Sequence, residues 1–487
     1  MRKTLHGIEM DLGARRDLLP ALDPGFVPLG LFLASYGERA GQTLRFALSE
    51  PGGRVVVRSM GICGTDRLRE ADLYAASQAV KLLLWQVGGS ALWLEGDLAV
   101  CEAVAAAYRP GGARAFDAGF METVYGQPFA VHVGEGIPAP KDDAPAAGRS
   151  FAGCRIGFDA GGSDRKVSAV IDGEVVYSEE TVWTPKTMAD GLYHVDGVRS
   201  SLRAAAAHLP RVDAIGISSA GIYADNRTLY AQLFGKVPPA QFDALIRDIY
   251  IEAVKEFGDV PLKVANDGDV TALAGSVAFG RDNLLGIAMG TSEAVGFIDR
   301  EGRITGWLNE LAFAPVDASP HAEADDWSGD IGCGYQYFSQ EAVIRLAGQA
   351  GVDLSGCGTP GEKLKQVQDL LAAGDARIPE VYRSAGRYLG HTTPLYHRMY
   401  GADSFLLLGR VMSGQGGEIL VESAREVMDE LYGDCPVEYI LPNEEFRRLG
   451  QSVVAASLST LAAKEAKEAA GSAETAQATG DDSSRGE

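Results

Sequence analysis

A short stretch near the middle of the chain combines an acid, two glycines and a hydroxyl. Residues 155–160 alternate large and small side chains as a strand does, and the acid of this strand is Asp159. Gly161 and Gly162 follow and, having no Cβ, let the backbone turn and approach a ligand, while Ser163 adds a hydroxyl. A carboxylate beside a glycine-rich hairpin suits a hydrated Mg²⁺ ion and a phosphate group, although ordinary hairpins also show this pattern.

A second acid follows a second predicted strand. Residues 262–267 read as a strand that ends in Asn266 and Asp267, and residues 268–280 continue as an alanine-rich helix. An Asn-Asp pair at such a junction is a common helix N-cap. On the local sequence alone, a cap and a catalytic acid both stay open.

Small residues end two further strands. The strand at 214–218 runs into Ser219 and Gly221, where small side chains would let a substrate approach the strand ends of an α/β sheet. The strand at 284–290 turns through Gly290 and Thr291 into a strand at 294–298. Two such hairpins facing each other would hold a phosphate chain from both sides.

A glycine-rich loop lies further along the chain. The apolar strand at 404–408 runs into Gly409, and Gly414 and Gly416 then precede a predicted helix at 418–431. A glycine turn before a helix N-terminus suits an adenosine or phosphate group.

The elements that must position these residues are strands and helices in α/β order. The hairpin at 155–180 turns at Asp172 and Gly173, and helices are predicted at 195–209 and 241–257. The first 135 residues show a similar order, with strands predicted at 26–36, 43–49, 54–58, 91–94 and 129–133 and a helix at 71–87. Two interpretations stay open: a degenerate duplicate, in which residues 34–37 lack the acid and double glycine and bind no metal, or two unrelated α/β units.

A chain of 487 residues is too long for one ordinary core, so we expect several domains. Residues 136–150 contain three prolines and predict a linker after an N-terminal α/β domain at 1–135. The boundaries that follow are a lobe at 151–280, a lobe at 281–465, and a tail at 466–487 that we expect to be disordered.

The composition excludes several classes of partner. The net charge of −22, with no basic stripe to offset it, predicts that nucleic acid is not a partner. No run of apolar residues approaches the roughly 20 needed to span a bilayer, and no signal peptide is recognisable. The six cysteines are scattered without a CxxC pair, which suits a reducing cytosol and predicts a cytoplasmic protein.

Taken in order, these pieces resemble the ROK family (repressors, open-reading-frame proteins and sugar kinases) of the actin–Hsp70–hexokinase superfamily, over about residues 153–460. Residues 159–163 and 289–292 look like its two phosphate loops, and residues 264–273 look like the strand and helix that carry its catalytic aspartate. Residues 309–313 look like its sugar-holding Gly-Glu-x-Gly-His segment. Residues 328–346 resemble the segment after its zinc knuckle, and residues 388–410 resemble the helix and strand that lead into its adenosine loop. The resemblance implies an α/β, two-lobed actin-like ATPase (ribonuclease H-like) fold with an additional N-terminal α/β domain.

The resemblance also implies roles for these residues. Asp267 would be the general base that takes the proton of a sugar hydroxyl as it attacks the γ-phosphate of ATP. Asn266 and Glu310 would hold the sugar, and Asp159 would hold Mg²⁺ through water. The phosphates would lie against Gly161, Gly162, Ser163, Gly290 and Thr291, and the adenosine against Gly409, Gly414 and Gly416. The implied cofactors are ATP and Mg²⁺, and many relatives are homodimers.

The sequence departs from the family in two places. Phe313 stands where the histidine of the zinc knuckle falls and Cys333 is the only nearby cysteine, so we predict no zinc and expect His321 on the surface of its loop. Ser292 and Glu293 replace the glycines usual in the second phosphate loop. A carboxylate at position 293 would repel ATP unless it points away or helps to hold the metal.

Three functions therefore compete. The first is an ATP-dependent sugar kinase of carbohydrate metabolism, the second a weak or inactive sugar- or nucleotide-binding regulatory relative, and the third a superfamily ATPase that activates a partner enzyme. A DNA-binding repressor is disfavoured because the N-terminal stretch is strand-rich and acidic. For residues 1–135 we expect a packing or dimerisation role.

Overall fold

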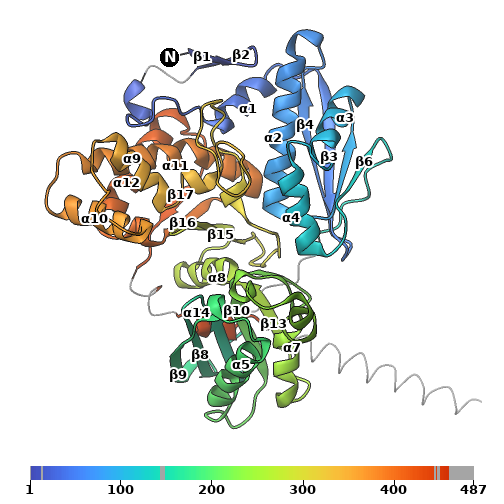
Figure 1. The fold of residues 1–487 in the computed structure, drawn as a ribbon, viewed down its shortest axis with the longest axis vertical. Helices are drawn as coiled ribbons and strands as arrows, with labels where there is room; N and C mark the ends of the chain where they lie inside the picture. Colours follow the sequence, from blue (N-terminus) through green and yellow to red (C-terminus); the bar gives the residue numbers. More distant parts are fainter. Residues whose placement is uncertain (1, 12–14, 143–148, 444–445, 447–449, 460–487) are drawn as a thin grey trace, which may run out of the picture. The chain divides into compact units, whose positions relative to one another are not determined.

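The computed structural model describes residues 2–11, 15–142, 149–443, 446 and 450–459. The chain forms two compact units (Figure 1). Unit 1 comprises residues 1–144, 281–301 and 305–443, and unit 2 comprises residues 145–280, 302–304 and 444–487. The N-terminal domain therefore shares one unit with the segment that follows residue 280. The predicted tail at 466–487 lies outside the described residues.

Unit 2 is built on a five-stranded sheet in the order β13-β10-β7-β8-β9. An antiparallel meander is formed by β7 (Cys154–Ala160), β8 (Asp164–Ile171) and β9 (Glu174–Val182), whereas β10 (Ala214–Ser219) and β13 (Leu262–Asn266) run parallel to β7. The predicted hairpin turn is confirmed, since Asp172 and Gly173 have φ of +50° and +88°. The carboxyl ends of the three parallel strands meet at one edge.

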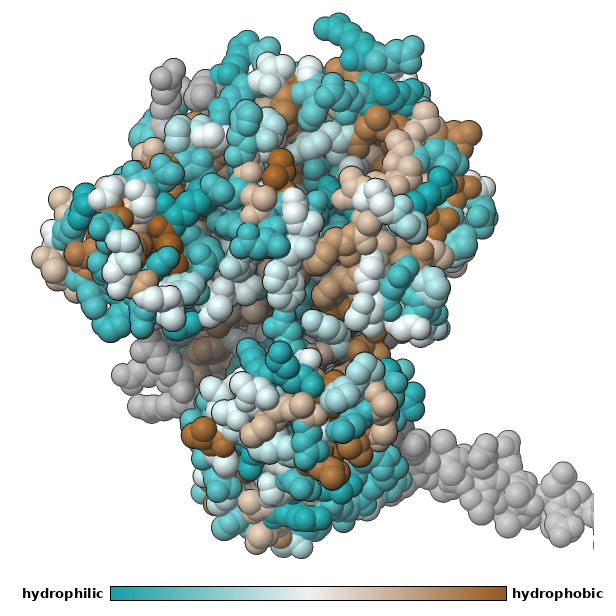
Figure 2. Space-filling view, in the orientation of Figure 1, coloured by the Kyte–Doolittle hydropathy of each residue, from teal (hydrophilic) through white to brown (hydrophobic). Residues whose placement is uncertain are grey.

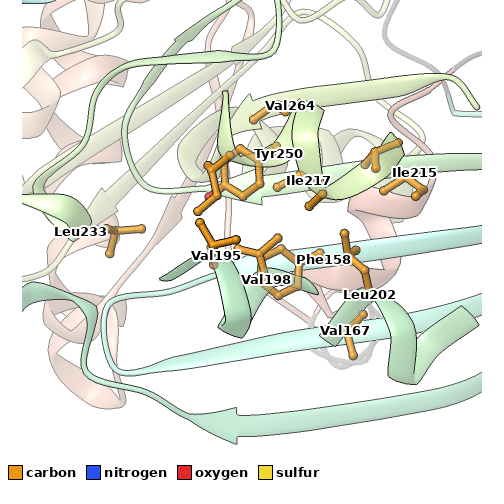
Figure 3. Packing of buried hydrophobic residues seen from close by; sticks show 14 of the residues in the cluster. Phe158, Val167, Val195, Val198, Leu202, Ile215, Ile217, Leu233, Tyr250 and Val264 are labelled. Atoms are coloured by element: carbon orange, nitrogen blue, oxygen red, sulfur yellow. The ribbon is translucent and has the colours of Figure 1, made fainter. Parts of the chain in front are cut away.

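Helices cover this sheet and enclose its core. Figure 3 shows Phe158, Ile217 and Val264 from the sheet packed with Val198 and Leu202 of a helix. The helices are α5 (Gly191–Ala206), α6 (Pro239–Gln241), α7 (Ile249–Val254), α8 (Asp267–Phe279) and α14 (Gln451–Ala456), and a small hairpin is formed by β11 (Ile222–Ala224) and β12 (Arg227–Tyr230). The helix predicted at 241–257 is wrong as one element, because a π-helical turn at Phe242–Ile246 separates α6 from α7.

The helix α14 belongs to unit 2 although it follows the segment of unit 1 in sequence. A Cβ added at Gly157 would lie 1.7 Å from the carbonyl oxygen of Ser452, and one at Gly216 would lie 1.7 Å from that of Ala455. Only glycine in β7 and β10 lets this helix backbone come so close. The guanidinium of the buried Arg155 donates to the carbonyl of Ser459 at 2.7 Å and further ties this end to the sheet.

The later part of unit 1 contains a four-stranded sheet in the order β15-β14-β16-β17. Its strands are β14 (Leu284–Met289), β15 (Glu293–Ile298), β16 (Ser404–Leu408) and β17 (Glu438–Ile440), and its helices are α9 (Gln340–Gln349), α10 (Pro360–Ala372), α11 (Ile378–Tyr400) and α12 (Gln415–Leu431). The hairpin β14–β15 is antiparallel, and β16 and β17 are parallel to β14. Both units thus pair an antiparallel hairpin with parallel strands.

The N-terminal domain has its own sheet in the order β4-β3-β5-β6. Its elements are β1 (Arg2–Leu5), β2 (Ile8–Asp11), α1 (Leu29–Gly37), β3 (Gln42–Ser49), β4 (Val55–Ile62), α2 (Arg69–Val87), β5 (Ala91–Glu95), α3 (Leu98–Ala107), α4 (Ala115–Tyr125) and β6 (Ala130–Val133). The strand predicted at 26–36 is wrong, since these residues contain α1. In addition, β5 pairs directly with β3, whereas in unit 2 β7 lies between β10 and β8, so the two sheets differ in the order of their strands.

The N-terminal domain is joined to the rest of unit 1 by an extended segment before α1. The amide of Val27 donates to Asp317 Oδ1 at 2.9 Å, and the amide of Leu29 donates to the carbonyl of Val316 at 2.9 Å. The buried ring of Phe26 packs against Tyr388 of α11 at a centroid distance of 4.9 Å. This segment therefore packs into unit 1 rather than linking two separate bodies.

Hydrophilic residues are spread over the face seen in Figure 2, and hydrophobic residues lie there in small groups. This agrees with the acidic composition of the chain. Among the helices that the structure describes, none has the length and apolar character required to cross a membrane.

Candidate active site

The carboxyl edge of the sheet in unit 2 collects the polar residues that the sequence singled out. Asp159 of β7 pairs in register with Ser218 of β10, and Ser219 pairs with Asn266 of β13. The hydroxyl of Ser218 donates to Asp159 Oδ1 at 2.8 Å. Parallel pairing thus brings together side chains that lie far apart in the sequence.

Burial and charge both act on Asp159. Its side chain is buried, and burial raises the pKa of the carboxyl to about 6, against the hydrogen bond from Ser218, which lowers it. The negative charge of Asp267 raises this pKa further, so the two acids interact within unit 2. A Mg²⁺ ion needs oxygen ligands and is often held by one or two carboxylates together with substrate phosphates. Asp159 fits that role, because a cation would offset both its burial and its repulsion from Asp267.

Asn266 and Asp267 begin helix α8. The side chain of Asn266 accepts a 2.7 Å hydrogen bond from the amide of Gly268 and donates to the carbonyl of Gly221 at 2.8 Å. The helix-cap interpretation is therefore correct for Asn266. Asp267, in the first turn of α8, is half-buried, and burial raises the pKa of its carboxyl while the Gly268 amide and the charge of Lys186 lower it. The cap fixes the backbone that carries this acid.

The glycine turn after β7 lies against a lysine that the sequence analysis missed. A Cβ at Gly162 would lie 3.3 Å from Lys186 Nζ, and a Cβ at Gly161 would lie 2.9 Å from the carbonyl oxygen of Asp164. The indole of Trp183 donates to the carbonyl of Gly161 at 2.8 Å and holds the turn. Lys186 is exposed and follows a proline, and no spacing in the sequence connects it to this turn.

Ser163, Ser219 and Gly221 have different surroundings. Ser163 is exposed, and its hydroxyl donates to the neighbouring Asp164 at 3.2 Å. Ser219 is fully buried and accepts hydrogen bonds from Tyr223 at 2.6 Å and Tyr250 at 2.8 Å. Gly221 has φ of +152° and packs against Tyr230 and Ala231. A sugar contact through Ser219 or Gly221 stays a prediction.

Unit 1 carries the second set of predicted residues. Gly409 has φ of +100°, and a Cβ there would lie 2.3 Å from the carbonyl oxygen of Met289, so the loop after β16 lies directly against the end of β14. In the hairpin turn that follows β14, the amide of Gly290 donates to the carbonyl of Ser292 at 3.0 Å. The guanidinium of Arg410 donates to Thr291 Oγ1 at 2.8 Å. Arg410 is exposed and adds a positive charge beside the predicted second phosphate loop.

The other two glycines of the predicted adenosine loop, after Gly409, differ in exposure. Gly414 is exposed, has φ of +65° and caps α12. Gly416 is buried, and a Cβ there would lie 2.4 Å from the ring of Tyr382. Helix packing thus accounts for the glycine at 416, and a nucleotide contact at either position stays a prediction.

Glu293 points away from the surface. It is the first residue of β15, is 3% exposed, and accepts a hydrogen bond from the Tyr396 hydroxyl at 3.2 Å through Oε1. Its Oε2 is buried with no hydrogen-bond partner in the described part of the chain, and a Cβ at Gly334 would lie 2.2 Å from it. Burial raises the pKa of this carboxyl to about 8. A buried acid that is mostly neutral near pH 7 is not a charge facing the phosphate loop.

Glu310 is half-buried at the start of a short 3-10 turn, Leu311–Phe313. Phe313 stacks on Trp85 with ring centroids 4.4 Å apart, so it is a core residue of unit 1. Cys333 is buried, and burial raises the pKa of its thiol to about 12. Within the described residues no group of three or more histidines, cysteines or acids is arranged to hold a metal ion. His321 is exposed, as predicted.

Comparisons with known proteins found likenesses among solved structures only. No protein-family model matches the sequence, and no curated protein matches it either. The ROK-family glucokinase of Streptomyces griseus, solved with glucose and AMPPNP, is 21% identical over 63% of this chain and 99% of its own, with a TM-score of 0.45. The ROK hexokinase of Thermus thermophilus is 21% identical over 64% and 99% of the two chains, with a TM-score of 0.48.

A regulator is among the similar structures as well. The ROK-family transcriptional regulator that is a homologue of the E. coli MLC protein is 18% identical over 63% of this chain and 79% of its own, with a TM-score of 0.49. The prediction that nucleic acid is not a partner of this chain stays a prediction. The structure itself confirms the predicted α/β class, because helices and mixed sheets alternate along the chain, and the actin-like architecture stays a prediction.

Proposed function

We propose that the chain transfers the γ-phosphoryl group of ATP to a hydroxyl of a sugar. One observation carries this proposal: three parallel strands of unit 2 bring Asp159 and Asp267 to one edge, where the two acids interact. Phosphoryl transfer to an alcohol needs one acid for the metal and another for the proton of the acceptor. Asp159, which is buried and bonded to Ser218, suits the metal, and Asp267, whose pKa is raised by burial, suits the proton.

Asp267 is proposed as the general base. It takes the proton of the sugar hydroxyl as that oxygen attacks the γ-phosphorus, the new O–P bond forms, the bond to the bridging oxygen breaks, and ADP leaves with the electron pair. Burial raises the pKa of Asp267 and makes it a stronger base than an exposed carboxylate, while Lys186 helps to keep it ionised. Asp159 would hold Mg²⁺ through water, and the ion would neutralise charge on the phosphates.

A cationic side chain lies beside each of the two predicted phosphate hairpins. Lys186 lies over the Gly161–Gly162 turn in unit 2, and Arg410 lies beside Thr291 in unit 1. Glu293 is not expected to repel ATP, because its side chain is buried and bonded to Tyr396. These observations favour phosphate binding over a purely structural role for the two hairpins.

The test is turnover with an acceptor panel. Purified protein is given Mg-ATP with hexoses, N-acetylhexosamines or polyols, and ADP release is measured. Asp267→Asn should lower kcat by about 100-fold or more, since a positioned general base contributes on that scale. Asp243→Asn is the matched control, because Asp243 is an exposed acid of unit 2 paired with Arg247; this variant should keep wild-type turnover.

Other outcomes would replace the proposal. ADP release that does not depend on any sugar, and that Asp267→Asn does not change, would favour an ATPase that activates a partner. Calorimetric binding of a sugar or nucleotide without turnover would favour a regulatory protein. Turnover equal in Asp267→Asn and wild type would remove Asp267 as the base.

A further inference from the structure

In the N-terminal domain, the end of one helix binds the segment that carries Glu310. The amides of Asn309 and Glu310 each donate a 2.9 Å hydrogen bond, to the carbonyls of Gln86 and Trp85 respectively. Both carbonyls lie in the last turn of α2, where the helix itself offers no donors. The helix end therefore needs partners, and residues 309–310 supply them.

We propose that α2 of the N-terminal domain positions Glu310 for the acceptor sugar, with Trp85 as the positioning residue. This inference rests on the proposed function and on the sugar-holding role that the resemblance implies for Glu310. It gives residues 1–135 a part in the acceptor site beyond packing. The backbone hydrogen bonds are the first of three sets of contacts that carry it.

The second set is made by side chains on one face of α2. Lys81 and Trp85 are four residues apart and so lie on the same side of the helix. The fully buried indole of Trp85 stacks on Phe313, and its Nε1 donates to Asp117 Oδ1 at 3.2 Å. Because Phe313 ends the 3-10 turn that begins after Glu310, Trp85 fixes both ends of this short turn.

Buried charged residues of the N-terminal domain also contact the later part of the loop that follows Glu310. The ammonium of Lys81 contacts Asp330 and lies 3.3 Å from Asp117, and the guanidinium of Arg114 lies 2.8 Å from Asp330. Asp330 lies just before residues 332–334, which pair with residues 314–317 through the amide of Val316 and the carbonyl of Gly332 at 2.8 Å. The N-terminal domain thus anchors the loop both where it leaves Glu310 and where it returns.

The third set reaches α11. The side-chain amide of Gln86 donates to the carbonyl of Met399 at 2.7 Å, and the Tyr400 hydroxyl donates to Asn309 Oδ1 at 3.0 Å. Asn309 itself has φ of +54°, in the left-handed region that asparagine enters more readily than most other non-glycine residues. The turn before Glu310 is therefore fixed by two helices, one of which belongs to the N-terminal domain.

The experiment compares two tryptophans of the same domain. Trp85→Phe keeps an aromatic ring but loses the hydrogen bond to Asp117 and part of the contact with Phe313. Trp93→Phe is the matched control, since Trp93 of β5 bonds Ser49 and stacks on His132 instead. With the best acceptor of the sugar panel, Trp85→Phe should raise KM for the sugar by about five- to tenfold and KM for ATP by less than about twofold.

The control should leave both KM values within about twofold of wild type. Asp330→Ala, which removes the loop-side anchor of Lys81 and Arg114, should show the same selective rise for the sugar as Trp85→Phe. Equal rises for sugar and ATP, or the same rise in Trp93→Phe, would indicate general destabilisation and overturn the inference. Unchanged KM values in Trp85→Phe and Asp330→Ala would overturn it as well.

A readout without substrate separates this inference from the proposed function. Hydrogen–deuterium exchange of a peptide covering residues 306–316 should become about fivefold faster in Trp85→Phe and Asp330→Ala, but not in Trp93→Phe. Faster exchange in a protein without sugar turnover would keep α2 as the anchor and remove the kinase proposal. Sugar turnover in the wild type with unchanged exchange in both variants would keep the kinase and overturn the anchor.

Discussion

The hydroxyl of Ser218 donates a 2.8 Å hydrogen bond to the carboxylate of Asp159, across two parallel strands that pair in register. Both side chains are buried. The hydrogen bond favours the ionised carboxylate, whereas burial disfavours it and raises its pKa to about 6. Ser218 therefore helps to set the pH above which Asp159 carries the charge that a metal ion needs.

Replacing Ser218 by alanine should shift the acid limb of the activity profile to higher pH. The variant loses the hydrogen bond that lowers the pKa of Asp159, so the carboxylate stays protonated at pH values where the wild type is ionised. The measurement is the pH dependence of kcat/KM with Mg-ATP between about pH 5 and pH 8. Ser168→Ala is the control, because Ser168 is a buried serine of β8 that bonds Ser452 instead; an equal shift in that variant would refute the assignment.

Replacing Lys186 by methionine should weaken ATP binding. The ammonium lies over the Gly161–Gly162 turn, where the proposed phosphate chain would lie, and methionine removes the charge while it keeps the length of the side chain. We expect KM for ATP to rise by about tenfold, the scale of one charge-assisted contact. Lys255→Met, an exposed lysine paired with Glu252, is the matched control. An unchanged KM for ATP in Lys186→Met would remove this lysine from the site.

Part of the candidate site could be predicted from the sequence because it lies at strand ends. Alternating side chains locate β7 and β13, and the polar residues that follow them then share one edge of the sheet. Lys186 and Arg410 could not be predicted in the same way. Their positions depend on contacts with Gly162 and Thr291, which lie 24 and 119 residues away (186 − 162 and 410 − 291), and no local pattern encodes such contacts.

The error at residues 26–36 has a physical cause. Residues 26–36 are almost continuously apolar, and such a run does not distinguish a buried strand from a buried helix. The helix α1 begins directly after Pro28, and Leu29, Phe32 and Tyr36 then share its buried face. The sequence left open whether Glu293 points toward the phosphates or away from them, and the alternation along β15 decides this: Glu293, Val295 and Phe297 face the core of unit 1, whereas Ala294 is exposed.

The glycine at 409 should tolerate no side chain. Gly409→Ala would place a methyl group 2.3 Å from the carbonyl oxygen of Met289 at φ of +100°, and we expect it to lower the free energy of unfolding by about 2 kcal/mol or more. Gly348→Ala is the matched control, since Gly348 lies in α9 with nothing within 4 Å of an added Cβ. That change should raise the free energy of unfolding by up to about 1 kcal/mol. Urea denaturation of both variants checks the difference, and equal effects would contradict it.

Glu293→Gln should remove a pH-dependent loss of stability. Burial raises the pKa of the Glu293 carboxyl from 4.5 to about 8 in the folded protein. Between these values the folded state holds the proton more tightly than the unfolded state, so the free energy of unfolding falls as pH rises from about 4.5 to about 8. The full loss is up to about 5 kcal/mol.

A glutamine at 293 stays neutral throughout this range and keeps a carbonyl oxygen for the Tyr396 hydroxyl, so the variant should lack the fall that this carboxyl causes. We expect Glu293→Gln to match the wild type within about 1 kcal/mol near pH 5 and to exceed its stability near pH 9, as measured by urea denaturation. Glu422→Gln, an exposed glutamate of α12, is the control and should follow the wild type at every pH. Parallel curves for Glu293→Gln and wild type would mean that the buried carboxyl is not protonated in the folded protein. An ionised Glu293 would then repel ATP at the adjacent loop and would argue against the kinase proposal.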